Sequence, residues 1–305
     1  MLLKLWMRAL RAPFFQAVII PLALGTSVAW YHTGQFHAGY FILALFGVVF
    51  IHAGTNLAND YFDHKSRADE INKQHTRFSG GSRVIQEGLM APRAIARASF
   101  VFFGLAVLIG LYLAYFRGPA ILVIGAIGLA SGYFYSATPL NLGYRGYGEL
   151  LVGINCGPLV VLGAYYLQAQ SFNLQALAAS VPVGLLMAAV LYIAQFPDVE
   201  ADKAANKNTL VVRMGTARAI KGFYLLLVCA YLAIVIGCVS GLIPSLGLIA
   251  LLSAPLAWRA ARSAGENHAS GSGARLVPAM AGTIGTHLVT GILLCSGYLA
   301  AGIVK

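Results

Sequence analysis

The chain has 305 residues, of which 59% are hydrophobic and only 10% are charged. Because soluble domains carry roughly a quarter charged residues, this composition excludes a water-soluble globular protein and places most of the chain in lipid. The formal net charge is +11. The basic residues fall in loops between apolar runs, which favours loops at an anionic membrane surface and excludes nucleic acid as a partner.

The first twelve residues, MLLKLWMRALRA, place three basic side chains on one helical face: Lys4, Arg8 and Arg11. This pattern predicts a short interfacial amphipathic helix over residues 1–12. A cleaved signal peptide is less favoured, because no small-residue cleavage site precedes a polar domain.

Nine apolar runs follow, each close to the roughly 20 residues that a helix needs to cross a bilayer. They lie near 14–34, 38–56, 97–116, 119–137, 149–168, 175–197, 220–240, 242–262 and 281–302. The 34 glycines suit the close approach of helices in a membrane. The sequence therefore predicts an all-α membrane protein with nine transmembrane helices in a single domain, 1–305.

The basic residues divide unevenly between the two predicted sides of the membrane. Only Arg117 and Lys305 fall outside the side that holds the N-terminus. Because cytoplasmic loops are enriched in Lys and Arg, we expect the N-terminus and the loops 57–96 and 198–219 to be cytoplasmic and the C-terminus outside. This orientation suits a cytoplasmic membrane of the prokaryotic type.

Four cysteines fall within predicted spans and form no CxxC pair: Cys156, Cys229, Cys238 and Cys295. We expect them to be buried packing residues rather than a disulfide or a metal site.

All ten acidic residues lie on the predicted cytoplasmic side. After the second span, Asn56, Asp60 and Asp63 are spaced i, i+4, i+7 and therefore share one helical face. Like charges this close are destabilising unless a cation lies between them. Oxygen ligands without His or Cys suit Mg²⁺, which binds through one or two carboxylates plus substrate phosphates.

A second cluster follows the sixth span, where Gln195, Asp198 and Asp202 are spaced i, i+3, i+7. Either cluster alone is also typical of ordinary acids at helix ends. Two similar clusters at equivalent places, in a chain otherwise poor in acids, favour a metal site shared by two related halves around one central cavity.

Basic and glycine-rich segments follow both clusters. Residues 77–83 read RFSGGSR, in which the Gly80–Gly81 backbone and the neighbouring Ser and Arg side chains offer donors to an anion. Lys203 and Lys207 follow the second cluster. Such a loop alone is also typical of a flexible connector, but beside paired carboxylates it indicates a metal–diphosphate site.

These motifs resemble those of the UbiA superfamily of intramembrane prenyltransferases over nearly the whole chain. Segments 56–63 (NLANDYFD), 139–149 (PLNLGYRGYGE) and 198–215 are similar, more narrowly, to the 1,4-dihydroxy-2-naphthoate polyprenyltransferases of menaquinone biosynthesis. Two segments depart from the family pattern: 78–83, where a region richer in basic residues is usual, and 195–198, where an asparagine–arginine lead-in is frequent.

The resemblance implies a UbiA-like fold and transfer of a polyprenyl group from an allylic prenyl diphosphate to an aromatic acceptor. The implied acceptor is 1,4-dihydroxy-2-naphthoate, giving demethylmenaquinone. Two Mg²⁺ ions would assist ionisation of the diphosphate, one held by Asp60 and Asp63 with Asn56, and the other by Asp198 and Asp202. The further residues expected to bind substrate are Asn59, Arg77, Ser82, Arg83, Tyr135, Tyr144, Arg145, Glu149, Gln195, Lys203 and Lys207.

Some of these residues have more specific expected roles. The Arg145 guanidinium would pair with the acceptor carboxylate, although its position also suits a simple anchor at the inner membrane face. Aromatic faces such as those of Tyr61, Phe134 and Tyr135 would shield the allylic cation. The prenyl tail would lie in an apolar chamber in contact with membrane lipid.

Three other functions remain open on the sequence. The acceptor of the same reaction could instead be 4-hydroxybenzoate, homogentisate, a tetrapyrrole or a lipid alcohol. An ion-coupled transporter is less favoured, because its acids would lie near the bilayer midplane rather than at the cytoplasmic helix ends. An alcohol phosphatidyltransferase would concentrate its acids in one continuous motif, which this chain lacks.

Overall fold

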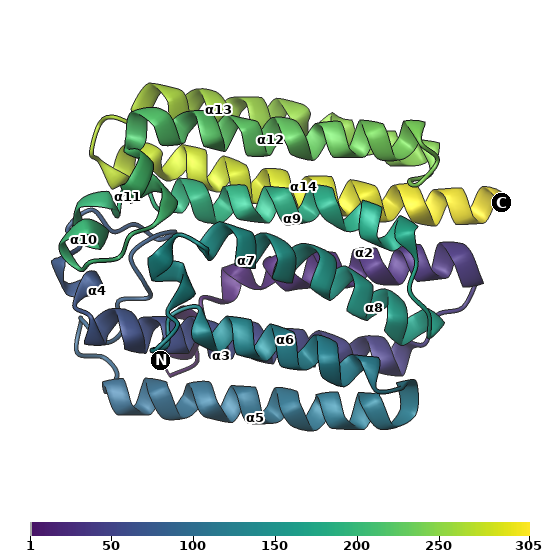
Figure 1. Cartoon of the computed structure of the whole chain (residues 1–305), viewed down its shortest axis with the longest axis horizontal. Coiled ribbons are helices and arrows are strands. Elements are labelled where there is room, and N and C mark those ends of the chain that lie inside the picture. Colours follow the sequence, from purple (N-terminus) through teal and green to yellow (C-terminus); the bar gives the residue numbers. More distant parts are fainter. Residues whose placement is uncertain (1) are drawn as a thin grey trace.

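The computed structural model describes residues 2–305, which form helices joined by loops (Figure 1). The helices that build the bundle lie side by side: α2 (Gln16–Thr33), α3 (Ala38–Lys65), α5 (Pro92–Arg117), α6 (Ala120–Phe134), α7 (Gly148–Ile154), α8 (Val160–Ala169), α9 (Leu174–Ala194), α12 (Thr216–Val239), α13 (Ala254–Asn267) and α14 (Gly273–Val304). A π-helical turn, η3 (Asn155–Leu159), joins α7 to α8, and the 3-10 helix η4 (Ser245–Ser253) leads into α13.

The short elements are α1 (Leu2–Ala9), η1 (Ala12–Phe15), α4 (Ala68–Ile71), η2 (Leu142–Arg145), α10 (Val199–Ala204) and α11 (Leu210–Met214). In Figure 1, α4, α10 and α11 lie together at one end of the bundle, and the C-terminus lies at the other end. The two loops that follow the aspartate clusters are therefore at the same end of the molecule.

Seven of the helical segments between residues 2 and 305 are long and apolar enough to cross a membrane, which confirms an integral membrane protein. The predicted run 119–137 corresponds to α6, which is apolar but shorter, with 15 residues. The run 242–262 corresponds to η4 and the first part of α13, where Arg259 and Arg262 interrupt the apolar sequence. The count of nine spans stays a prediction.

Of the segment 1–12 that was predicted as an interfacial helix, Leu2–Ala9 form the helix α1, and position 1 lies outside the described residues. Its location at the membrane interface stays a prediction. The inner side of α1 is apolar, because Leu5 and Trp6 pack with Leu57 of α3 and Ile95 of α5. The chain then turns through Arg11, at a φ of 52°, into η1 and α2. This turn carries the Arg11 side chain toward the end of α3.

Helix α9 lies at the centre of the bundle, where it contacts α2, α7, α8, α12 and α14. Glycines allow its closest approach to the α7–η3 segment. A Cβ atom added to Gly157 would lie 2.7 Å from the Gly184 Cα and 2.9 Å from the Ser180 carbonyl oxygen. Small residues at such crossings are typical of helix packing in membranes.

We expect Gly157→Ala to destabilise the protein, because the new methyl group must push η3 and α9 apart, and overpacking costs about 1–3 kcal/mol. Thermal unfolding in detergent should show a lowered Tm. Gly104→Ala on α5 is the matched control, because no atom lies within 4 Å of its added Cβ. Equal unfolding temperatures for the two variants would contradict this packing.

Candidate active site

A cavity of about 1000 Å³ runs through the bundle, with charged side chains at one end and apolar side chains along its depth. The charged mouth lies at the end of the bundle that carries α4 and α10 (Figure 1). The deep part is lined by side chains such as Leu22, Leu113 and Leu167. Such a cavity matches a ligand with an anionic head and a long apolar tail.

The first aspartate cluster is held by basic side chains. Asp60 is 2% exposed and accepts hydrogen bonds from the Arg11 guanidinium, the Ser82 hydroxyl and the Ser82 backbone N–H. Arg11 also donates to Asn59 Oδ1 at 2.9 Å. The segment before α2 and the loop after α3 therefore meet at Asp60.

Asp63 lies one turn further along α3 and is also buried. It accepts a 2.6 Å hydrogen bond from the Tyr144 hydroxyl and pairs with Lys207 Nζ at 3.1 Å. The same Nζ atom lies 3.5 Å from the Asp202 carboxylate. Lys207 thus joins the two aspartate clusters, which the sequence separates by more than 130 residues, at one mouth.

The second cluster has fewer basic partners. Asp198 accepts hydrogen bonds from Asn72 Nδ2 at 2.7 Å and from the Gly80 backbone N–H at 3.2 Å. Burial raises the pKa of Asp198, and it raises the pKa of Asp202 to about 7. Burial would lower the pKa of Lys207, but the facing carboxylates Asp202 and Asp63 hold that pKa well above its usual value.

Gly80 and Gly81 bring the loop after α3 close to the acids. Both have a positive φ, 73° and 77°, which only glycine adopts without strain. A Cβ on Gly81 would collide with the Asp69 carboxylate, and one on Gly80 would lie 2.7 Å from Asn72 Nδ2. The glycine pair is therefore required where the loop backbone crosses Asp69 and Asn72.

Asp69 was not predicted as a site residue, yet it lines the cavity, and its Oδ2 is buried without a partner among residues 2–305. Burial, with Asp63 and Asp60 nearby, raises the pKa of Asp69 to about 7. Arg11 and Asn72 were missed as well. Asp69 and Asn72 lie beyond the end of α3, where helical spacing no longer applies, and Arg11 was assigned only to the interfacial helix.

Most of the predicted residues line the cavity: Asn56, Asn59, Asp63, Arg77, Ser82, Arg83, Tyr135, Gln195, Asp198, Asp202 and Lys207. Asp60 lies beside it, covered by Arg11 and Ser82. Arg83 donates to the Asp69 backbone carbonyl, which fixes the loop. Tyr144 contacts Asp63 from outside the cavity.

Besides Tyr144, three more predicted substrate-binding residues do not line the cavity. Arg145 is exposed and donates to the Pro139 carbonyl at 2.9 Å, because η2 directs it outward. Lys203 is exposed on α10, next to the inward-facing Asp202. Glu149 is buried outside the cavity lining, and neither of its oxygens has a partner in the described chain.

The oxygen atoms that the side chains offer at the mouth are of the chemical type that binds Mg²⁺. Among residues 2–305, no three acidic, His or Cys side chains converge as a metal site, since Arg11 and Lys207 occupy the positions beside Asp60, Asp63 and Asp202. The oxygen ligands at the mouth are carboxylates, among them that of Asp69. Hard oxygen ligands of this type are those that Mg²⁺ prefers.

The profile of the UbiA prenyltransferase family matches residues 18–301. The chain belongs to this family. It is 34% identical over 302 residues to a 2-carboxy-1,4-naphthoquinone phytyltransferase of Synechocystis, covering 98% of this chain and 94% of that one. It is 33% identical over 298 residues to a 1,4-dihydroxy-2-naphthoate octaprenyltransferase of Mycobacterium tuberculosis, covering 97% of each chain.

Solved structures confirm the UbiA-like fold. A UbiA homologue from Archaeoglobus fulgidus bound to GPP and Mg²⁺ has a TM-score of 0.62 at 18% identity, covering 96% of this chain and 99% of that one. A digeranylgeranylglyceryl phosphate synthase has a TM-score of 0.65 at 16% identity, covering 98% and 99%. The expected class, a UbiA-family prenyltransferase, is confirmed by the family match.

We expect Lys207→Met to destabilise the metal-free UbiA-family protein by about 3–5 kcal/mol at pH 8, because removing one partner of a buried pair leaves uncompensated charge. The defect should shrink at pH 5, because burial raises the pKa of Asp202 to about 7, so that this carboxyl takes up a proton in the folded protein and no longer needs the cation. Thermal unfolding at the two pH values measures this, with the exposed Lys203→Met as control. A defect that is equal at both pH values would contradict the assignment.

Proposed function

We propose that this chain transfers a polyprenyl group from an allylic prenyl diphosphate to 1,4-dihydroxy-2-naphthoate, giving demethylmenaquinone in its reduced form. The observation that supports it most is the single cavity whose charged mouth joins both aspartate clusters through Lys207 and whose depth is apolar. The naphthoate acceptor is supported by the names of the relatives from Synechocystis and Mycobacterium tuberculosis.

In the proposed reaction, the ring carbon that carries the carboxylate forms a bond to the allylic carbon. The bond from that carbon to the diphosphate oxygen breaks, and the diphosphate leaves with the electron pair. Carbon dioxide then leaves the ring, and its bonding electrons restore aromaticity. Every atom and electron pair is accounted for without an oxidant or an added base.

The mouth residues would hold the leaving group. Asp60 and Asp63 with Asn56, and Asp198 with Asp202, are the proposed ligands of two Mg²⁺ ions, with Asp69 as an additional acid at the same mouth. Bound Mg²⁺ would supply positive charge that stabilises the departing diphosphate. Lys207 and Arg11, together with Arg77 and Arg83, would donate hydrogen bonds to diphosphate oxygens.

The orientation belongs to the same proposal. The distribution of Lys and Arg supports a cytoplasmic N-terminus and cytoplasmic active-site loops, with the C-terminus outside. The diphosphate would then enter from the cytoplasm while the prenyl tail lies within the thickness of the bilayer.

We expect Asp60→Asn, Asp63→Asn, Asp198→Asn and Asp202→Asn each to lower turnover by about two orders of magnitude or more, because each removes charge that a diphosphate-bound metal needs. Turnover is measured as prenylated naphthoate formed by purified protein with Mg²⁺. Glu200→Gln, exposed on α10, is the matched control and should retain activity. Full activity in EDTA, or in Asp198→Asn, would rule out a site built from both clusters.

A further inference from the structure

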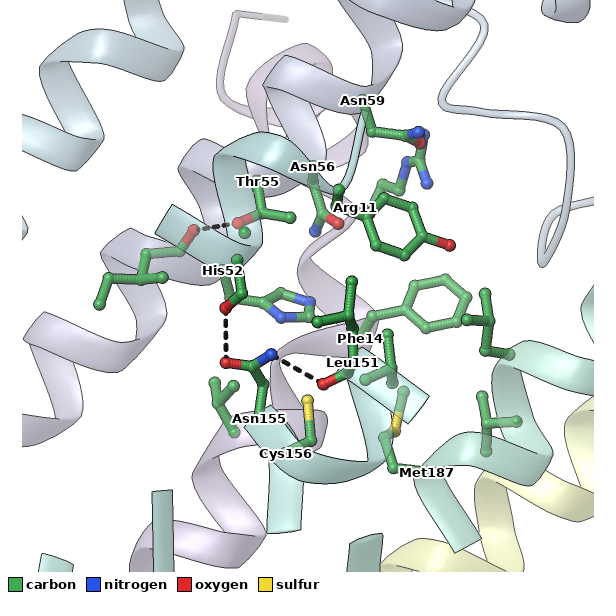
Figure 2. A pocket seen from close by; sticks show the side chains of 18 of the residues that line it. Arg11, Phe14, His52, Thr55, Asn56, Asn59, Leu151, Asn155, Cys156 and Met187 are labelled. Atoms are coloured by element: carbon green, nitrogen blue, oxygen red, sulfur yellow. Dashed lines mark hydrogen bonds between the residues drawn. The ribbon is translucent and has the colours of Figure 1, made fainter. Parts of the chain in front are cut away.

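A polar patch lies within the cavity below the charged mouth (Figure 2). It consists of His52 and Thr55 on α3, Ser131 on α6 and Asn155 at the start of η3. His52 precedes Asp60 by two helical turns, so it lies about 12 Å deeper along the helix axis. Neither a diphosphate at the mouth nor an apolar tail needs polar groups at this depth.

The imidazole of His52 is placed by its neighbours but lacks a polar partner. The Phe15 ring packs edge-on against it, with ring centroids 5.9 Å apart and an interplanar angle of 85°. His52 Nε2 is buried and has no hydrogen-bond partner within residues 2–305. Because Nε2 is closed off by protein atoms, the ring nitrogen that a ligand in the cavity can reach is Nδ1, which would accept a hydrogen bond from a donor group.

An unpartnered imidazole is not distinctive by itself, since His287 on α14 has two unpartnered ring nitrogens in the described chain and lies outside the cavity lining. His52 differs by its position. Figure 2 shows its ring between Asn155 on one side and Asn56 and Arg11 on the other.

Asn155 is held in a fixed orientation. Its Nδ2 donates to the Leu151 carbonyl at 2.7 Å, and its Oδ1 lies 2.8 Å from Ser131 Oγ, whose single proton also has the Ile127 carbonyl as an acceptor at 2.6 Å. The neighbouring glycines Gly153 and Gly157 face α9, which leaves Asn155, between them in sequence, on the cavity side. An amide carries two N–H groups, so one remains to donate to a ligand.

We propose that His52 and Asn155 form the subsite for a hydroxylated aromatic acceptor, an inference that rests on the proposed function. A ring hydroxyl donates to the His52 imidazole, and the free Asn155 N–H donates to an oxygen on the ring. As the ring carbon bonds to the allylic carbon, positive charge spreads to that hydroxyl, and the hydrogen bond to His52 stabilises it. The proton stays on the hydroxyl when carbon dioxide leaves.

The test compares His52→Phe, which keeps a planar ring, with His52→Gln, which keeps a hydrogen-bond acceptor, and with His287→Phe as the matched control. We expect His52→Phe to raise the acceptor KM by about 10-fold or more, the loss typical of one buried hydrogen bond. The prenyl diphosphate KM should change less than about 2-fold. His52→Gln should retain part of the acceptor affinity, and His287→Phe should resemble wild type in both constants.

The second readout is discrimination between 1,4-dihydroxy-2-naphthoate and its two mono-methyl ethers. Wild type should use one mono-methyl ether, the one that keeps the hydroxyl facing His52, about 10-fold better than the other. His52→Phe should lose this preference. Folding is checked by the rise in Tm that Mg²⁺ and a prenyl thiodiphosphate produce. If His52→Phe does not show this rise in Tm, the kinetic test uses Asn155→Ala instead, for which we expect the same increase in acceptor KM.

An acceptor KM and hydroxyl preference in His52→Phe equal to those of wild type would overturn the subsite, as would an equal change in His287→Phe. If wild type ignores naphthoates but prenylates 4-hydroxybenzoate, the proposed acceptor is wrong and the same variants test the subsite with that ring. If wild type prenylates no hydroxylated aromatic ring, both the proposed function and the proposed subsite are wrong.

Discussion

Buried carboxylates at the mouth of the cavity must be neutralised, and the structure around them depends on how this is done. An unpaired charge away from water is strongly unfavourable, and Asp60, Asp63 and Asp202 are all buried. Arg11 reaches Asp60 from the segment before α2, and Lys207 reaches Asp63 and Asp202 from the segment after α10. These pairs join the N-terminal segment, the end of α3 and the α9–α12 connection. Two basic side chains thus neutralise the carboxylates that are the proposed metal ligands.

The same arrangement separates two environments within one cavity. Charge is confined to the mouth, where the loop at Gly80 and Gly81 crosses Asp69, and the depth is lined by apolar side chains from α2, α3, α5 and α8. Because Gly153 and Gly157 pack closely against α9, Asn155 faces the cavity, in the region between its charged mouth and its apolar depth. A polar patch between mouth and depth gives the cavity three consecutive regions, which suit a diphosphate, an aromatic ring and a prenyl tail.

The sequence was sufficient to predict the helical membrane fold, the family and most of the mouth, because apolar run length and helical spacing are local properties. Asp60 and Asp63 lie on one face of α3, so their proximity follows from spacing alone. Arg11, Asp69 and Asn72 were missed because their positions depend on turns and on a loop crossing that periodicity does not describe. Arg145 and Lys203 were placed by motif position, and the short helices η2 and α10 turn both outward. Helical spacing identified the face of α3 that carries the acids. Which side chains from other segments lie against that face depends on tertiary packing.

The central claim is the reaction itself, and product analysis tests it most directly. Purified protein with Mg²⁺ would be incubated with prenyl diphosphates of several lengths and with a panel of acceptors, including 1,4-dihydroxy-2-naphthoate, 4-hydroxybenzoate and homogentisate. Mass spectrometry would identify what forms. We expect a prenylated naphthalenediol whose mass shows loss of carbon dioxide, formed only when metal and both substrates are present. A product that retains the carboxylate, or prenylation of a different acceptor with none of the naphthoate, would contradict it.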